Sequence, residues 1–116
     1  MNNQKVLLCG AHDALFKAMQ VSSAASIDVE QYTDLHLNTQ LHLMQQVGMV
    51  VVLHAPPQFD GLPMVRNWRR ESPETPVVVA TSDYSGATTR LLFKSGAVDV
   101  LELPADQERI LACYEA

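Results

Sequence analysis

Residues 49–54 read MVVVLH, an apolar run that is typical of a strand buried on both faces of a sheet. Residues 76–81, PVVVAT, form a second such run, and their β-branched side chains favour a strand. A third apolar segment, KVLLCG, covers residues 5–10 and ends in glycine. Apolar and polar residues alternate at 26–32 and 98–103, which predicts two half-exposed strands near the sheet edges. The chain thus offers three strands for the centre of a sheet and two for its edges.

Helical patterns fill the gaps between these strands. They are predicted at residues 13–21, 37–44, 62–68 and 86–94, and after residue 106. Strands that alternate with helices imply a parallel sheet covered on both faces, and right-handed crossovers make this a doubly wound sandwich. In the strand order 2-1-3-4-5, strands one, three and four are central, which matches the continuous apolar runs. The sequence therefore predicts an α/β three-layer sandwich with a five-stranded parallel sheet of this order, in a single domain spanning residues 1–116.

Length, composition and charge exclude several classes of protein. A chain of 116 residues, 47% hydrophobic and 18% charged, is a single globular domain rather than a disordered segment. No apolar run approaches the ~20 residues of a membrane span or resembles a signal peptide, so we expect a cytoplasmic protein. The net charge of −5 argues against direct nucleic-acid binding. Cys9 and Cys113 are expected to be reduced.

Four short motifs occur in order along the chain. They are Pro57 with Asp60-Gly61-Leu62, Thr75–Ser82, Ser95–Leu101 and Pro104. Their order and spacing resemble those of response-regulator receiver domains, the CheY-like fold of two-component signalling, over nearly the whole chain. The resemblance implies a CheY-like or flavodoxin-like sandwich, a regulatory rather than enzymatic role, and a cis bond at Leu103-Pro104.

The residues that carry phosphotransfer in receivers do not follow the resemblance. The phosphoacceptor aspartate is replaced by Leu53, or by His54 if the count shifts by one residue. The two acids that hold magnesium are replaced by Gly10 and Ala11, which offer no side-chain oxygen. Among the other functional positions, Leu103 replaces the lysine, Val100 replaces the switch aromatic, and the Thr81 hydroxyl is retained. We therefore expect a pseudo-receiver with no catalytic residue, no cofactor and no metal.

Two groups of residues admit a more specific function. His12 and His54, with Cys9 and Asp13 nearby, are expected at the ligand-binding edge of the sheet and could hold a transition metal. No ligand spacing supports that metal, so we favour structural roles, with His54 donating to a backbone carbonyl. Asp13 and Asp60 could also rebuild a metal site, which we disfavour.

A row of basic residues on the third predicted helix is the second group that admits a more specific function. Arg66, Arg69 and Arg70 beside Trp68 could suit phosphate or nucleic acid, but we favour a solvated helix face with Trp68 in the core.

Protein contact is the function that the resemblance favours. Receivers commonly act through the fourth helix, fifth strand and fifth helix, which here carry Arg90, Lys94, Asp99, Val100, Glu102, Asp106 and Arg109. We expect a homodimer or a protein partner on this face, and an output domain in the same full-length chain. Similar modules occur in pilus-assembly proteins of the CpaE/TadZ type and in orphan regulators. The alternatives are a phosphorylated receiver with a displaced acceptor and a small flavodoxin-like ligand-binding domain.

Overall fold

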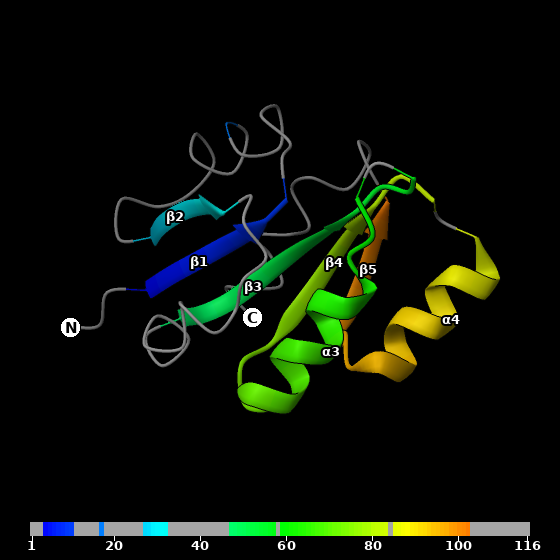
Figure 1. Cartoon of the computed structure of the whole chain (residues 1–116). Helices are drawn as coiled ribbons and strands as arrows, with labels where there is room; N and C mark the ends of the chain where they lie inside the picture. Colours follow the sequence, from blue (N-terminus) through cyan, green and yellow to red (C-terminus); the bar gives the residue numbers. More distant parts are fainter. Residues whose placement is uncertain are drawn as a thin grey trace.

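A computed structural model of the chain describes residues 4–10, 17, 27–32, 47–57, 59–83 and 85–102. Five strands form one parallel sheet in the order β2-β1-β3-β4-β5 (Figure 1). The strands are β1 Gln4–Cys9, β2 Ile27–Tyr32, β3 Val47–His54, β4 Val77–Thr81 and β5 Asp99–Glu102. The predicted strand order is confirmed. The described helices are α3 Leu62–Glu71 and α4 Gly86–Ser95.

The remaining sequence predictions of local structure fall outside the described residues. They are the helices at 13–21, 37–44 and after 106, apart from Lys17, and the cis bond at Leu103-Pro104. Within the described ranges, the Pro56-Pro57 bond is cis. No helix in the part of the chain that the structure describes is long and apolar enough to cross a membrane.

The centre of the sheet is where the apolar runs predicted it. β3 pairs with β4 from Val50↔Val77 to His54↔Thr81, and with β1 on its other side. All of β4 is buried, as is β3 from residue 49 onward. β3 begins at Val47, two residues before its predicted start, because Val47 still pairs with Lys5 across an irregularity in the register. The sheet centre is therefore encoded directly in the runs of valine and leucine.

Both faces of the sheet are buried. Because side chains alternate along a strand, Leu7, Val50 and Val79 project to one face and pack in one cluster with Trp68 and Leu92 of the helices. The residues that alternate with them are also buried, namely Val6, Leu8, Val51, Val78 and Leu101. A fully buried side chain of this size contributes roughly 1.5–3 kcal/mol. This double burial is what a three-layer sandwich requires.

The helices α3 and α4 lie side by side on one face of the sheet (Figure 1). α3 has a proline in its first turn, where no backbone N–H is needed, and buries Trp68 on its inner side. α4 begins at the N-cap Ser85, whose hydroxyl accepts from the Thr88 backbone N–H at 3.2 Å. It ends at Gly96, which has φ +127° and donates its N–H to the last turn, as is common for a glycine that ends a helix. The two caps thus define where α4 begins and ends.

Candidate functional site

The carboxyl ends of β1, β3 and β4 meet at one edge of the sheet. This edge is where open α/β folds bind their ligands. The structure brings four of the predicted site residues to it, namely Gly10, Leu53, His54 and Thr81. Ala11 and Leu103 lie outside the described residues. The described part of this edge is therefore formed by the ends of three neighbouring strands, β1, β3 and β4.

Leu53 occupies the predicted acceptor position and is packed against Gly10. Its side chain is 3% exposed. A β-carbon on Gly10 would lie 2.6 Å from Leu53 Cβ and 3.1 Å from Cδ2, so the leucine fills the space beside the glycine. Gly10 also has φ +131°, a conformation that side chains other than hydrogen rarely allow. The end of β1 and the end of β3 thus form an apolar contact where receivers hold acids.

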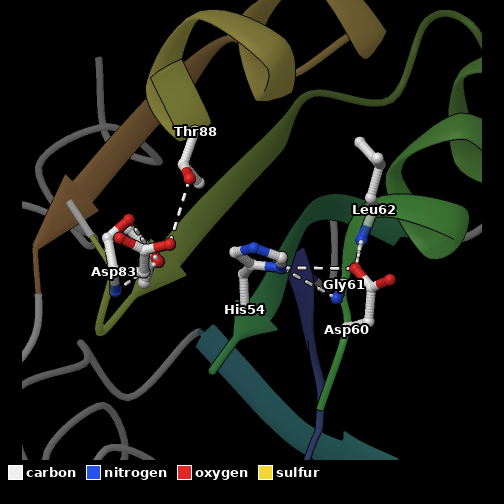
Figure 2. Close-up of polar contacts among 7 residues, drawn as sticks. His54, Asp60, Gly61, Leu62, Asp83 and Thr88 are labelled. Carbon is white, nitrogen blue, oxygen red and sulfur yellow. Dashed lines mark hydrogen bonds and ion pairs between the residues drawn. The ribbon is translucent and has the colours of Figure 1, made fainter. Parts of the chain in front are cut away.

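His54 is turned to the opposite side of the strand and serves the backbone. Its Nδ1 accepts the Gly61 backbone N–H at 3.0 Å (Figure 2). Accepting at Nδ1 requires a neutral ring with its proton on Nε2. The predicted donation from His54 to a backbone carbonyl was wrong, since the ring accepts from a backbone N–H. The start of α3 comes very close to the end of β3 at this point. A β-carbon on Gly61 would overlap the Leu53 carbonyl oxygen, so only a glycine allows this approach.

Asp60 is committed to the start of α3. Its Oδ1 accepts the Leu62 backbone N–H at 3.1 Å and lies 3.6 Å from His54 Nδ1 (Figure 2). The carboxylate thereby satisfies a donor at the helix N-terminus. Among the described residues, no group of three His, Cys, Asp or Glu side chains could hold a metal ion. Asp13 and His12, the other members of the predicted alternatives, lie outside the described residues.

The Thr81 hydroxyl is held by the chain that follows β4. It accepts the Asp83 backbone N–H at 2.9 Å and donates to the Asp83 carbonyl at 3.2 Å, while the side chain is fully buried. The Asp83 carboxylate in turn accepts from the Thr88 hydroxyl of α4 at 3.0 Å (Figure 2). Sequence reasoning missed Asp83, although a threonine two residues before an aspartate is a spacing at which side chains often bond the backbone. Both hydrogen-bonding capacities of Thr81 are therefore used within the loop.

Below the edge, Cys9 is a buried, unreactive thiol. Burial raises the pKa of the Cys9 thiol to about 12, and the neighbouring Trp68 side chain opposes this rise. The Trp68 Nε1–H is itself buried and makes no hydrogen bond of standard geometry to a described residue. A thiol that stays protonated is a poor metal ligand and a poor nucleophile. Cys9 thus behaves as the small hydrophobic residue expected from the sequence.

The predicted interaction face is exposed only in part. Arg90 and Lys94 are exposed on α4. Val100 is 2% exposed and belongs to the core beneath the helices, so its assignment to the face was wrong. The physical reason is strand alternation, which turns Val100 toward the helices that cover β5.

The acidic residues assigned to this face have mixed positions. Asp99 is half-buried and accepts the Val100 backbone N–H at 2.9 Å, and Glu102 is exposed. Asp106 and Arg109 lie outside the described residues. Sequence reasoning missed two exposed apolar residues here, Leu91 at 45% and Val98 at 58%. Leu91 lies in the second half of α4, and Val98 lies in the turn between α4 and β5.

Comparisons with known proteins rest on structure, because no protein-family model matches the chain and no curated protein matches its sequence. The BeF3-activated receiver domain of DrrB matches with a TM-score of 0.81 at 20% identity, covering 99% of this chain and 96% of that one. The chain has the CheY-like receiver fold. The predicted fold class is thereby confirmed.

Two further receiver-fold matches differ in setting. A pilus assembly-related protein from Burkholderia pseudomallei matches with a TM-score of 0.78 at 15% identity, over 97% of this chain and 87% of that chain. NtrX from Brucella abortus matches with a TM-score of 0.77 at 19% identity, over 99% of this chain but 26% of that chain. The matched fold therefore makes up most of the solved chain of the first protein and about a quarter of the solved chain of the second.

Proposed function

We propose that the domain is a pseudo-receiver, a non-enzymatic signalling or regulatory module that is not phosphorylated and acts by protein contact. One observation carries the proposal: the side chain at the acceptor position is Leu53, buried against Gly10 at the end of β3. Only a carboxylate can form the acyl phosphate of receivers, and a leucine offers no oxygen. The receiver fold supplies the scaffold for contacts without that chemistry.

A displaced acceptor is the less supported alternative. Asp60 holds the first turn of α3, and Asp83 accepts from the Thr88 hydroxyl. Either carboxylate would have to leave its partner to bind a phosphoryl group, and magnesium prefers several oxygen ligands together. A flavodoxin-like ligand site has as little support, since Gly10-Ala11-His12-Asp13 is a poor phosphate-binding loop in sequence.

Contact through α4 and β5 is the second part of the proposal. We define the α4–β5 surface by Arg90, Leu91, Lys94 and Val98, all exposed. Leu91 and Val98 supply apolar area, and the two cations beside them would set the orientation of a partner more than its affinity. A second copy could use this surface around a two-fold axis, so we propose a homodimer or a docked protein partner.

The setting proposed for the domain is the cytoplasm, beside an output domain. NtrX, in which the matched fold forms about a quarter of the chain, is the precedent for an attached output domain. The Burkholderia protein is pilus assembly-related, which favours a CpaE/TadZ-type setting over other orphan regulators. No direct contact with nucleic acid or with a membrane is part of this role.

An NMR titration tests the loss of phosphate chemistry. Magnesium and beryllofluoride, a phosphoryl mimic, are added to the labelled domain while the amides of Leu53, His54 and Thr81 are followed. We expect no saturable shift at these three amides. Saturable shifts that depend on both reagents would refute the pseudo-receiver assignment.

Sedimentation of the full chain tests the contact surface. Leu91→Asp and Val98→Asp should each lower the association constant of the dimer or of a bound partner. Lys17→Asp, at an exposed position outside α4 and β5, is the control and should leave association unchanged. Equal association of all four proteins would show that the α4–β5 surface is not the interface.

A further inference from the structure

The outward surface of α3 and α4 carries most of the positive charge of the chain. The two helices hold five basic residues and one acidic residue. The rest of the chain holds three basic and twelve acidic residues. A protein with a net charge of −5 therefore concentrates its cations on one helical layer, which covers one face of the sheet (Figure 1).

Arg66 and Arg69 are the two arginines of α3 that make no side-chain hydrogen bond or ion pair to another described residue. Both are exposed, one turn apart, and neither has an ion pair within the described ranges. Arg70, by contrast, donates from Nε to Glu71 at 3.2 Å and from Nη2 to Asn67 at 2.6 Å. The donors of Arg66 and Arg69 are thus available to a ligand from outside.

An exposed aromatic ring lies beside these arginines. A β-carbon on Gly96 would lie 2.9 Å from Arg69 Cβ, so the flank of α4 that includes Gly96 is the one next to α3. Phe93 precedes Gly96 by three residues and shares this flank, with 44% of its surface exposed. α3 and α4 lie side by side (Figure 1), and Arg66 precedes Arg69 by the same three residues that separate Phe93 from Gly96. The exposed Phe93 ring is therefore on the flank of α4 that faces the arginines of α3.

We propose that this α3–α4 surface, defined by Arg66, Arg69 and Phe93, binds an acidic segment of a partner protein that carries an apolar side chain. The planar donors of arginine match the two oxygens of a carboxylate. An apolar side chain of the partner would cover Phe93, whose exposure to water is unfavourable. Together these groups form a small apolar centre with a charged rim, the usual make-up of an interaction hot spot.

The charge distribution of the chain favours an acidic protein segment over a nucleic acid as the ligand of the α3–α4 surface. A nucleic acid approaches as a dense line of phosphates, and the twelve acidic residues outside these helices repel it. A short acidic segment can reach the cationic layer without passing the rest of the protein. The inference goes beyond the proposed pseudo-receiver role, and it uses the flank of α4 opposite to Leu91.

Peptide selection on the full chain tests the proposal. The protein is presented to a library of short random peptides, and enriched peptides are synthesised with a fluorophore and measured by anisotropy. We expect enriched peptides to carry aspartate or glutamate on both sides of an apolar residue. Arg66→Gln and Arg69→Gln should each weaken binding about tenfold, because each loses a charge-assisted pair. Phe93→Ser should also weaken it.

Matched controls keep the result specific. Lys17→Gln removes an exposed cation outside both helices and should leave peptide binding unchanged, as should Leu91→Asp. Thermal melting of each variant verifies its fold. Failure of Leu91→Asp to affect dimerisation would count against the α4–β5 surface but not against this proposal.

Four outcomes would overturn the inference. The first two are a library selection without acidic peptides, and equal binding of those peptides by Arg66→Gln and Arg69→Gln. The third is a single-stranded DNA oligonucleotide that binds more tightly than the peptides and with the same dependence on the two arginines. The fourth is self-association that is lost in the two arginine variants, which would make a second copy the occupant.

Discussion

Replacing Leu53 by aspartate is the most informative single change, because it places a carboxylate at the acceptor position without restoring its partners. Leu53 is almost fully buried, and deleting such a side chain costs about 2–5 kcal/mol of unfolding free energy. Leu53→Asn adds the cost of an unpaired polar group, about 1–3 kcal/mol. Leu53→Asp adds a charge that has no cation or metal beside it. The asparagine variant is therefore the matched control for the charge alone.

The charge makes the aspartate variant sensitive to pH. Burial without a partner raises the pKa of a carboxyl, and a rise of about 3 pH units corresponds to about 4 kcal/mol. The folded-state pKa then lies above the unfolded value of about 3.9, so the folded protein binds more protons. Stability of Leu53→Asp should increase as the pH falls from about 8 to about 5, while Leu53→Asn should change little by comparison.

Urea unfolding monitored by Trp68 fluorescence measures both variants, since Trp68 is the single tryptophan and is fully buried. Measurements should begin near pH 5, where the aspartate variant is most stable, because a domain of this size has only about 5–15 kcal/mol to lose. Millimolar MgCl2 should not stabilise Leu53→Asp, since Gly10 and Ala11 contribute no carboxylate. Equal stability of the two variants at pH 7, or selective stabilisation of the aspartate variant by magnesium, would refute the reasoning.

Three further predictions concern the frame around the site. Gly61→Ala should lower the free energy of unfolding by about 1–3 kcal/mol, because its β-carbon overlaps a β3 carbonyl oxygen. Gly86→Ala places its β-carbon in open space, so it should be neutral or stabilise the protein by up to about 1 kcal/mol. Chemical unfolding compares the two variants. Ser85→Ala should cost about 1 kcal/mol by removing the N-cap of α4, and a thermal melt that is unchanged would exclude the cap. In a Cys113→Ser background, Cys9, with a pKa of about 12, should not react with a disulfide reagent at pH 8 until the protein unfolds.

The order of the sheet could be predicted because burial on both faces leaves a direct mark on a sequence. Residues 49–54 and 77–81 are apolar without alternation, and they form the two strands at the centre. Residues 27–32 alternate and form an edge strand. The early start of β3 could not be predicted, since Gly48 is a poor strand residue that the register skips, while Val47 before it still pairs with Lys5 of β1.

The site was harder to predict because neighbouring residues of a strand face opposite ways. Counting from Asp60-Gly61 gives Leu53 as the acceptor position, and a shift of one residue gives His54. The structure separates them, with Leu53 beside Gly10 and His54 bonded to Gly61. The histidine bond depends on how closely α3 approaches the end of β3, which a sequence pattern does not encode.

The exposure of single residues could not be predicted where it depends on how a helix or strand is oriented against its neighbours. Leu91 and Leu92 both fit an apolar helix, yet consecutive residues lie about 100° apart, and only Leu92 faces the sheet. Val100 was assigned to a contact face by resemblance, whereas its neighbours in β5 show that it packs under the helices. The exposed Phe93 was missed for the same reason, because its exposure depends on how α4 is rotated against α3.

Incubation with acetyl phosphate and magnesium, followed by intact mass, tests the central claim most directly. A receiver with an intact acceptor aspartate serves as the positive control in the same mixture. The account predicts that this chain keeps its mass while the control gains one phosphoryl group. A phosphoryl gain on this chain that is lost in Asp60→Asn or Asp83→Asn would contradict the claim and identify a displaced acceptor.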